Sequence, residues 1–361
     1  MFDVVTIGTA THDVFLASPL FKVVRDPEHL ERLGFPTGEA QCFALGGKVE
    51  VPSPVFTIGG GAANASVTFA RQGFKTAALA KIGKDQNARD ILSDLKKESV
   101  MTLPVFDSKA MTAYSVILLS PGGERTILNY RGASEDLRKN EIDFSRLKSR
   151  WAYIVPGRIR FDVIFSIVRH FKKEGIKIAM DFSKYYLQMG HKKLKPILNA
   201  LDVIHVNQEE GAELTGYKYH ETKKIFRKFD EWVPGLALMT DGANGAFISD
   251  GKMLYQFGTY KEKKLVDRTG AGDAFTSGFV AGLMSRQGTW GKRHETGNMR
   301  QETGNKRQGF SEEEITYAIR LASANATLVV EKIGATEGAL RKGEFEKDKR
   351  WKNLEIAVTN I

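Results

Sequence analysis

The segment from Asp267 to Asp273 has the composition of an anion-binding turn with a base beside it. Gly270 and Gly272 allow the backbone to turn its N–H groups toward a bound ion, and a following small-residue helix would add its positive end. A carboxylate at Asp273 would repel a phosphate. The carboxylate is better explained as a general base, which takes a proton from a hydroxyl while nearby amides stabilise the developing charge. An ordinary glycine-rich loop, with an acidic residue favouring the helix dipole, fits the same residues.

A second glycine cluster, Gly59 to Gly61, precedes another helical segment. Its glycines would let a ligand approach the backbone closely, and Asn64 can both donate to and accept from a polyol hydroxyl. A dinucleotide fingerprint would need a third glycine at Asn64 and an acidic residue about 20 positions later at the end of a second strand, and both are missing. The sequence also lacks a Walker-type Gly-Lys-Ser/Thr motif. The two loops together indicate phosphoryl transfer to an alcohol.

The composition is that of a globular protein. The 361 residues are 42% hydrophobic, which is enough for a substantial core. Cys42 is the single cysteine, so an internal disulfide and a multi-cysteine metal site are excluded. The N-terminal residues do not resemble a secretory signal, and no apolar run approaches the roughly 20 residues of a membrane span. We therefore expect a cytoplasmic protein with no membrane partner.

The formal net charge of +10 raises the question of a nucleic-acid partner. Much of the excess lies in residues 286–309, which hold six basic residues against two glutamates and a tandem seven-residue repeat starting at Glu295 and Glu302. Such polar sequence cannot bury enough apolar surface to fold alone, so we predict a disordered surface insertion. A basic flap that attracts a polyanionic ligand is the alternative. Scattered aromatics without basic neighbours argue against a nucleic-acid partner.

The rest of the chain alternates short β-rich runs with helical patterns. The predicted strands are 4–8, 76–82, 151–155, 176–180, 203–206 and 236–239, and the predicted helices are 62–72, 87–98, 163–174, 209–215 and 223–229. This pattern predicts a doubly wound α/β fold, with a mostly parallel sheet flanked by helices.

Two stretches with antiparallel signals interrupt the α/β pattern. Residues 14–58 contain a possible hairpin of 42–45 with 49–51, and residues 113–131 contain a second one of 113–119 with 125–130. We predict that these two segments form a small β-sheet lid. Exposed lid strands would either pair edge to edge in a homodimer or cap a monomer.

The order and spacing of these motifs resemble the ribokinase-like (PfkB) family of sugar and nucleoside kinases. The match spans roughly residues 3 to 340. The segments that resemble family motifs are Gly59 to Ser66 with Gly73 and Gly83, Ala80 to Asp85, Asn207 to Glu210, Thr240 to Gly245, and Asp267 to Val280. The resemblance implies a single kinase domain over residues 1–361. One departure is Arg268, where the family commonly has Thr, Ser, Pro or Val; a surface side chain is favoured over one that faces nucleotide phosphates.

The resemblance also implies roles for the residues of both glycine loops. Asp273 would be the general base, and the amides of Gly270, Ala271 and Gly272 would hold the phosphoryl group that ATP donates. Asn207 and Glu210 would hold Mg²⁺ through water, although from the residues alone they read as a helix cap and a solvated face. The other implied residues are Asp13, Gly60, Gly61 and Asn64 for the acceptor; Asn207, Thr240, Gly242, Gly245 and Ser323 or Asn325 for the nucleotide; and Asp267, Thr269 and Gly334 for a monovalent cation such as K⁺.

The sequence therefore predicts an ATP- and Mg²⁺-dependent kinase that phosphorylates a hydroxyl of a small sugar. A nucleoside kinase of the adenosine or cytidine type is the alternative, because the segment 14–58 could cover a base. A catalytically inactive binding module is a third reading, against which Asp273, Asn207 and Glu210 argue. Arg125, Tyr130 and Arg131 either reach the acceptor or lie on an exposed lid strand.

Overall fold

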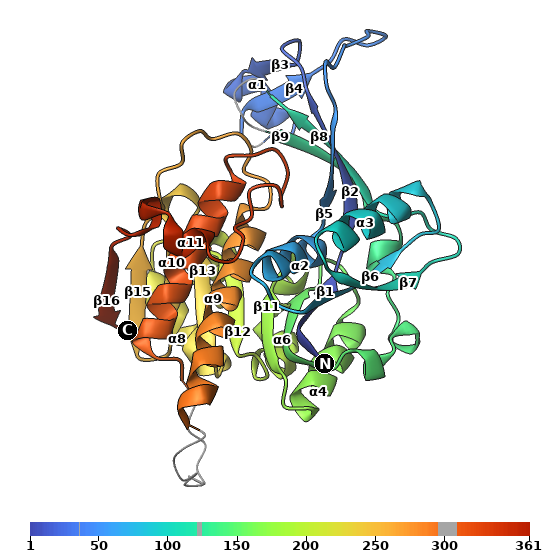
Figure 1. Ribbon diagram of the computed structural model, residues 1–361. Coiled ribbons are helices and arrows are strands. Elements are labelled where there is room, and N and C mark those ends of the chain that lie inside the picture. Colours follow the sequence, from blue (N-terminus) through green and yellow to red (C-terminus); the bar gives the residue numbers. More distant parts are fainter. Residues whose placement is uncertain (36, 121–124, 295–308) are drawn as a thin grey trace.

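The computed structural model describes residues 1–361 except 36, 121–124 and 295–308. Its centre is a ten-stranded sheet in the order β16-β15-β14-β13-β12-β11-β10-β1-β6-β7 (Figure 1). All neighbours from β13 to β7 are parallel, and β14, β15 and β16 add an antiparallel edge. The strands are β1 (Phe2–Gly8), β6 (Thr76–Ile82), β7 (Met101–Phe106), β10 (Ser149–Val155), β11 (Lys177–Asp181), β12 (Val203–Asn207), β13 (Leu236–Thr240), β14 (Ala246–Ser249), β15 (Met253–Phe257) and β16 (Ile356–Asn360).

Helices cover both faces of this sheet because its strands are apolar on both sides. In β1, Val5 and Ile7 pack with the helices of one face, and Val4 packs with those of the other. One face is covered by α2 (Gly61–Arg71), α9 (Ala271–His294) and α10 (Glu312–Val329). The other is covered by α4 (Phe161–Lys173), α6 (Gly190–Leu198), α7 (Gln208–Thr215) and α8 (Thr222–Trp232). The further helices are α1 (Pro27–Arg32), α3 (Gln86–Lys97), α5 (Lys184–Leu187) and α11 (Glu344–Lys347).

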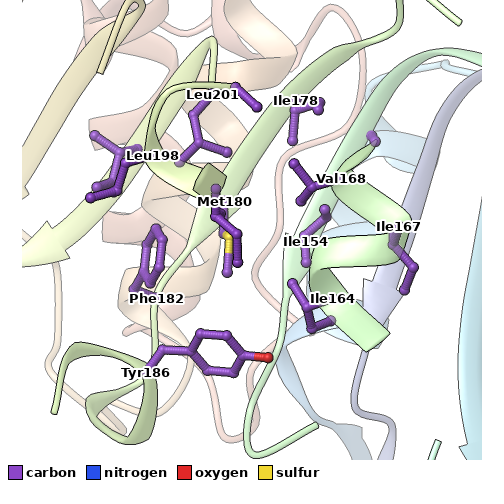
Figure 2. Packing of buried hydrophobic residues seen from close by; sticks show 14 of the residues in the cluster. Ile154, Ile164, Ile167, Val168, Ile178, Met180, Phe182, Tyr186, Leu198 and Leu201 are labelled. Carbon is purple, nitrogen blue, oxygen red and sulfur yellow. The ribbon is translucent and has the colours of Figure 1, made fainter. Parts of the chain in front are cut away.

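Figure 2 shows the larger core cluster, where side chains of α4 meet those of β10 and β11. Ile154, Ile164 and Met180 are fully buried there. Fully burying such a side chain stabilises the folded state by about 1.5–3 kcal/mol relative to leaving it exposed. The buried Tyr186 donates its hydroxyl to the carbonyl of Ile159 at 2.6 Å, which satisfies its polar group. The predicted strands and helices of the α/β pattern are all present, with ends that differ by a few residues.

A separate four-stranded sheet has the order β5-β2-β8-β9. Its strands are β2 (Thr11–Ala17), β5 (Val55–Gly59), β8 (Tyr114–Leu119) and β9 (Arg125–Tyr130). The expected hairpin of β8 with β9 is present. The expected hairpin of 42–45 with 49–51 was wrong, because β4 (Glu39–Cys42) pairs with β3 (Lys22–Arg25) instead. Turn signals at Gly46 and Gly47 mark a turn but do not select the partner strand.

The predicted insertion 286–309 is only partly described. Its first residues continue α9 to His294. The disorder predicted for the insertion stays a prediction. The tandem repeat, 295–308, lies outside the described residues. Among the residues that the structure describes, no helix is long and apolar enough to cross a membrane.

Candidate active site

The turn before α9 is shaped by two glycines with different roles. Gly270 has φ +77°, and a Cβ there would lie 2.4 Å from that of Ala335, so only glycine fits. A Cβ at Gly272 would meet open space, which leaves room for a ligand against the backbone. The Ala271 amide makes a long bond of 3.4 Å to the Arg268 carbonyl, and the Thr269 amide donates to Asp267 Oδ1 at 2.9 Å. The first-turn amides of α9 are thus available beside an open surface.

Asp273 lies in the first turn of α9 and contacts a residue 209 positions away. The Nδ2 atom of Asn64, on α2, donates to Asp273 Oδ2 at 2.8 Å. The Asn64 side chain is buried, and among the described residues its Oδ1 atom has no hydrogen-bond partner. A buried amide oxygen without a partner is costly, so Oδ1 is placed to accept a hydrogen bond from a ligand.

The environment of Asp273 makes its carboxylate a stronger base than usual. Burial, together with the nearby carboxylate of Asp181, raises the pKa of Asp273 from 3.8 to about 6. The hydrogen bond from Asn64 and the charge of His205 act in the opposite direction. A carboxylate with a pKa near 6 is ionised at neutral pH and still accepts a proton readily.

Asp13, which the resemblance assigns to the acceptor, lies inside strand β2. Its side chain is buried and accepts a hydrogen bond from Thr11 Oγ1 at 2.9 Å. Burial raises the pKa of Asp13 above its usual value, against the hydrogen bonds from Thr11 and Ser115. The strand register, in which Asp13 pairs with Ser115, holds this carboxylate on the inner face of the small sheet.

The cluster Gly59 to Gly61 makes room for both carboxylates. A Cβ at Gly59 would lie 1.9 Å from Asp13 Oδ2, and one at Gly61 would lie 3.2 Å from Asp273 Oδ1. Gly60, between β5 and α2, has φ +88°, and a Cβ there would lie 2.7 Å from the carbonyl oxygen of Thr9. The sequence indicated close approach of a ligand here, whereas the closest approach is made by the side chains that would act on the ligand.

These residues surround a smaller pocket of about 210 Å³ between α9 and the small sheet. Asp13, Gly60, Asn64 and Asp273 line it, whereas Gly61 supports it from behind. The inner face of the small sheet contributes Ser115, Ile117, Ile127 and Asn129, and Arg131 follows β9 on the same face. The further lining residues are Thr9, Thr11, Ser134, Thr269 and Gly270.

A larger pocket of about 330 Å³ lies on the other side of the same turn. The predicted residues Thr240, Gly242 and Gly245 line it. Its apolar part is built from Phe257, Tyr260, Leu265, Phe275, Ala326 and Val330. Ser323 lies among them, buried, and its hydroxyl has no hydrogen-bond partner among the described residues.

Asn325 is not brought to this pocket. Its Nδ2 atom donates to the carbonyl of Ala274 at 2.8 Å, and its Oδ1 atom accepts from the amide of Leu340 at 2.8 Å. Both ends of the side chain therefore connect α9, α10 and the chain near residue 340. The prediction that Asn325 binds a ligand is corrected to Ser323, because helix register could not be fixed from sequence.

Asn207 and Glu210 form a capping box at the start of α7. The Glu210 amide donates to Asn207 Oδ1, and the Asn207 amide donates to Glu210 Oε2, both at 2.9 Å. The second oxygen of Glu210 is left for a further contact. Burial raises the pKa of Glu210, opposed by its bond from Asn207 and by His205. Asn207 is exposed and does not line the larger pocket.

His205 lies in a buried polar group near the ends of the parallel strands. Its Nδ1 atom lies 2.7 Å from Asp181 Oδ1, and its Nε2 atom lies 3.1 Å from Thr240 Oγ1. Burial alone would lower the pKa of His205, but the Asp181 carboxylate raises it overall. Sequence reasoning missed Asp181, although its place at the end of a predicted parallel strand was a usable signal.

Asp267 is hydrogen-bonded to Thr269 and Gly334, the two other residues that were predicted to hold a monovalent cation. Its Oδ1 atom accepts from the amide and hydroxyl of Thr269 at 2.9 and 2.7 Å, and its Oδ2 atom accepts from the Gly334 amide at 3.2 Å. The buried carboxylate thus connects the turn to the loop at 334. Within the described ranges, no group of three His, Cys, Asp or Glu side chains is arranged to hold a metal ion.

The turn from residue 268 to residue 273 lines both pockets. Arg268, Ala271 and Gly272 face the larger pocket, and Thr269, Gly270 and Asp273 face the smaller one. Arg268 is exposed and also lines the larger pocket. A surface side chain and one that faces this pocket are therefore not exclusive alternatives. An anionic group held by the amides at Gly272 would lie next to a hydroxyl held at Asp273.

Known proteins are similar to this chain over most of its length. Residues 37–342 match the model described as pfkB family carbohydrate kinase. The ribokinase of Lactococcus lactis subsp. lactis (strain IL1403) is 26% identical over 300 residues, which are 82% of this chain and 87% of that protein.

Two solved structures share the fold over almost the whole chain. The ribokinase from Giardia lamblia has a TM-score of 0.73 at 19% identity, covering 96% of this chain and 98% of its own. The adenosine kinase from Sinorhizobium meliloti has a TM-score of 0.68 at 20% identity, covering 92% of this chain and 95% of its own. They confirm the predicted ribokinase-like fold.

Proposed function

Because the chain belongs to the pfkB family of carbohydrate kinases, we propose that it transfers the γ-phosphate of ATP to a hydroxyl of a small sugar. One observation carries the proposal: a single turn, 268–273, lines two pockets and presents helix amides to one and a carboxylate to the other. Phosphoryl transfer needs mainly positioning and charge stabilisation, and this turn is suited to both.

In the smaller pocket, Asp273 would take the proton of the acceptor hydroxyl as the bond from its oxygen to phosphorus forms. Asn64 holds Asp273 through Nδ2, and its buried Oδ1 atom is suited to accept from a second hydroxyl. Asp13, also buried in this pocket, would accept from a further hydroxyl. The carboxylates and the amide thus fit a compound with several neighbouring hydroxyl groups.

The lining favours a sugar over a nucleoside. The described residues around the smaller pocket include no aromatic side chain on which a base could stack. Its volume, about 210 Å³, is also below the roughly 300–1,000 Å³ typical of pockets for drug-sized ligands. A nucleoside acceptor is therefore kept as an outcome of the test.

The larger pocket fits ATP. Its apolar walls suit a flat base, and the unpartnered hydroxyl of Ser323 can bond to a ring nitrogen or amino group. The open surface at Gly272 and the first-turn amides of α9 suit the terminal phosphates. The amides of Gly270, Ala271 and Gly272 would stabilise the charge on the phosphoryl group.

We further propose that Glu210 and Asn207 bind Mg²⁺ through water. The second oxygen of Glu210, which has no hydrogen bond among the described residues, and the side-chain oxygen of Asn207 fit Mg²⁺, which prefers oxygen ligands and keeps most of its water. The ion would neutralise charge on the nucleotide phosphates. The monovalent cation at Asp267, Thr269 and Gly334 stays a prediction, as does a cytoplasmic location.

Replacing Glu210 by glutamine is expected to raise the Mg²⁺ concentration for half-maximal activity about tenfold. Glutamine keeps the capping bond through its oxygen but lacks the charge that attracts the hydrated ion. Glu209→Gln is the matched control, since Glu209 is an exposed neighbour in the same helical turn. Mg²⁺ titrations of ADP release measure the effect. An unchanged Mg²⁺ requirement in the Glu210 variant would remove the residue from this role.

The proposed reaction is tested by ADP release with ribose, fructose, ketodeoxygluconate, adenosine, cytidine and inosine as acceptors. Saturable ADP release with a sugar is the expected result. Saturation by adenosine or cytidine alone would assign a nucleoside kinase instead. If the protein binds ATP but none of these acceptors leads to ADP release, a catalytically inactive binding module is favoured.

The outer face of the small sheet supports the predicted homodimer. Phe56, Val14, Val116 and Leu128 lie in register across its four strands, on the face opposite Asp13. Phe56 is 60% exposed and Leu128 is 57% exposed. A row of exposed apolar side chains on a short sheet is typical of a surface that pairs with another copy. Dimerisation stays a proposal that the molar mass in solution can test.

A further inference from the structure

The smaller pocket is lined by charged side chains of both signs, which come from different elements. Asp13 and Asp273 lie against the glycine cluster, whereas Arg131 follows β9, which is separated by β8 from the strand that carries Asp13. Arg131 directly follows β9 and lines the pocket together with Ile127 and Asn129, which share one face of that strand. A ligand that reaches from Asp273 to Arg131 therefore spans the gap between the large sheet's helices and the small sheet.

Glu135 orients Arg131 at the mouth of the pocket. Its Oε1 atom lies 3.2 Å from Arg131 Nε and 4.0 Å from Arg158 Nε. The printed contact of the carboxylate with each guanidinium group is at Nε, and among the described residues the terminal nitrogens of Arg131 have no hydrogen bond, so they can bind another acceptor. Arg158 lies 5.4 Å from the ring centre of Tyr185, which restricts its position. The two arginines are about half exposed, which places them at the rim.

On the premise of the sugar kinase function above, we propose that the acceptor carries an anionic group, a phosphate or a carboxylate, which Arg131 binds. The planar fork of a guanidinium matches either group with two parallel hydrogen bonds. The carboxylates of Asp13 and Asp273 would repel an anion placed next to them, so only one orientation of the sugar is favourable. That orientation leaves a hydroxyl at Asp273.

The reaction leaves the anionic group unchanged. The acceptor oxygen forms a bond to the γ-phosphorus, the bond from that phosphorus to the ADP oxygen breaks, and the hydroxyl proton goes to Asp273. Arg131 therefore acts on binding and orientation of the acceptor. A change at Arg131 should alter the selectivity between charged and neutral sugars more than the turnover of a neutral sugar.

The test measures kcat/KM for fructose, fructose 1-phosphate, fructose 6-phosphate, gluconate and ketodeoxygluconate with the wild-type protein and with Arg131→Met. We expect a charged sugar to be preferred over fructose by about 10- to 100-fold, and Arg131→Met to remove most of that preference. Arg131→Lys should restore it in part, because the charge remains without the fork. Arg125→Met is the control, since Arg125 lies on the same face of β9 but outside the pocket.

A preference for the phosphates identifies a phosphorylated sugar, and a preference for the acids identifies a sugar acid; either supports the proposal if it depends on Arg131. Equal use of fructose, or a charged-sugar preference that Arg131→Met leaves intact, would overturn it while the kinase function stands. Absence of ADP release with every acceptor would instead overturn the kinase function. In that case thermal stabilisation by the same sugars, without ATP, still decides whether Arg131 binds an anion.

Discussion

Asp273→Asn is expected to lower kcat by about 10² to 10⁴ with nucleotide binding largely intact. The asparagine keeps the shape of the side chain, and its oxygen can still accept from Asn64 Nδ2, so the geometry of the 2.8 Å contact is retained. What is lost is the group that takes the hydroxyl proton. Steady-state ADP release and calorimetric titration with ATP measure the two effects separately.

The stability of this variant provides an independent check. The pKa of Asp273 is raised to about 6 by burial and by Asp181, so its ionised form destabilises the folded protein. This cost is absent below the unfolded pKa near 3.8, grows as the pH rises from there to about 6, and is constant at higher pH. At pH 7 to 8 the variant should therefore melt at or above the wild-type temperature.

A matched variant separates this loss of activity from a general effect of the substitution. Asp162 lies in the first turn of α4 and is exposed, so Asp162→Asn should leave kcat unchanged. Near-normal turnover in Asp273→Asn would remove Asp273 from the role of base. A loss of activity together with a lower melting temperature would indicate damage to the fold.

Asn64→Asp is expected to lower activity at pH 7 by about 10² and to move the pH profile upward. In the wild type, kcat/KM should fall tenfold per pH unit below about 6, as Asp273 takes up a proton. In the variant, a second carboxyl group stands where the Asn64 amide donates at 2.8 Å. Two carboxylates at that distance cannot both be ionised, so the pair holds a proton near neutral pH.

The shift in the profile distinguishes this explanation from simple disruption of the pocket. Activity of Asn64→Asp should recover at higher pH, with the acidic limb displaced by at least about one unit. Asn199→Asp, on an exposed residue after α6, makes the same substitution away from the site and should keep the wild-type profile. A low activity that does not recover with pH would contradict the shared-proton explanation.

The parallel core and the two glycine loops could be predicted because their signals are local. Continuous apolar runs such as 76–82 report burial on both faces, and β6 is fully buried as expected. The requirement for glycine at Gly270 follows from its positive φ, which other residues rarely adopt. The helix that starts at Ala271 follows from its small-residue spacing.

Predictions failed where the deciding contact lies far along the chain. Asn325 and Ser323 are two positions apart on one helix, and only packing against α9 shows which of them faces the pocket. The partner of β4 is β3, which turn residues at Gly46 cannot specify.

The sequence by itself determined the family, the doubly wound fold and Asp273 as the first residue to test, because glycines, apolar periodicity and motif spacing act over short distances. The tertiary structure alone decided what surrounds Asp273. The fold brings Asn64 to it from 209 residues away and places Asp181 and His205 close enough to change its pKa. It also brings Arg131 into the same pocket. The pKa of a carboxylate and the charge of an acceptor depend on such neighbours, which no local pattern specifies.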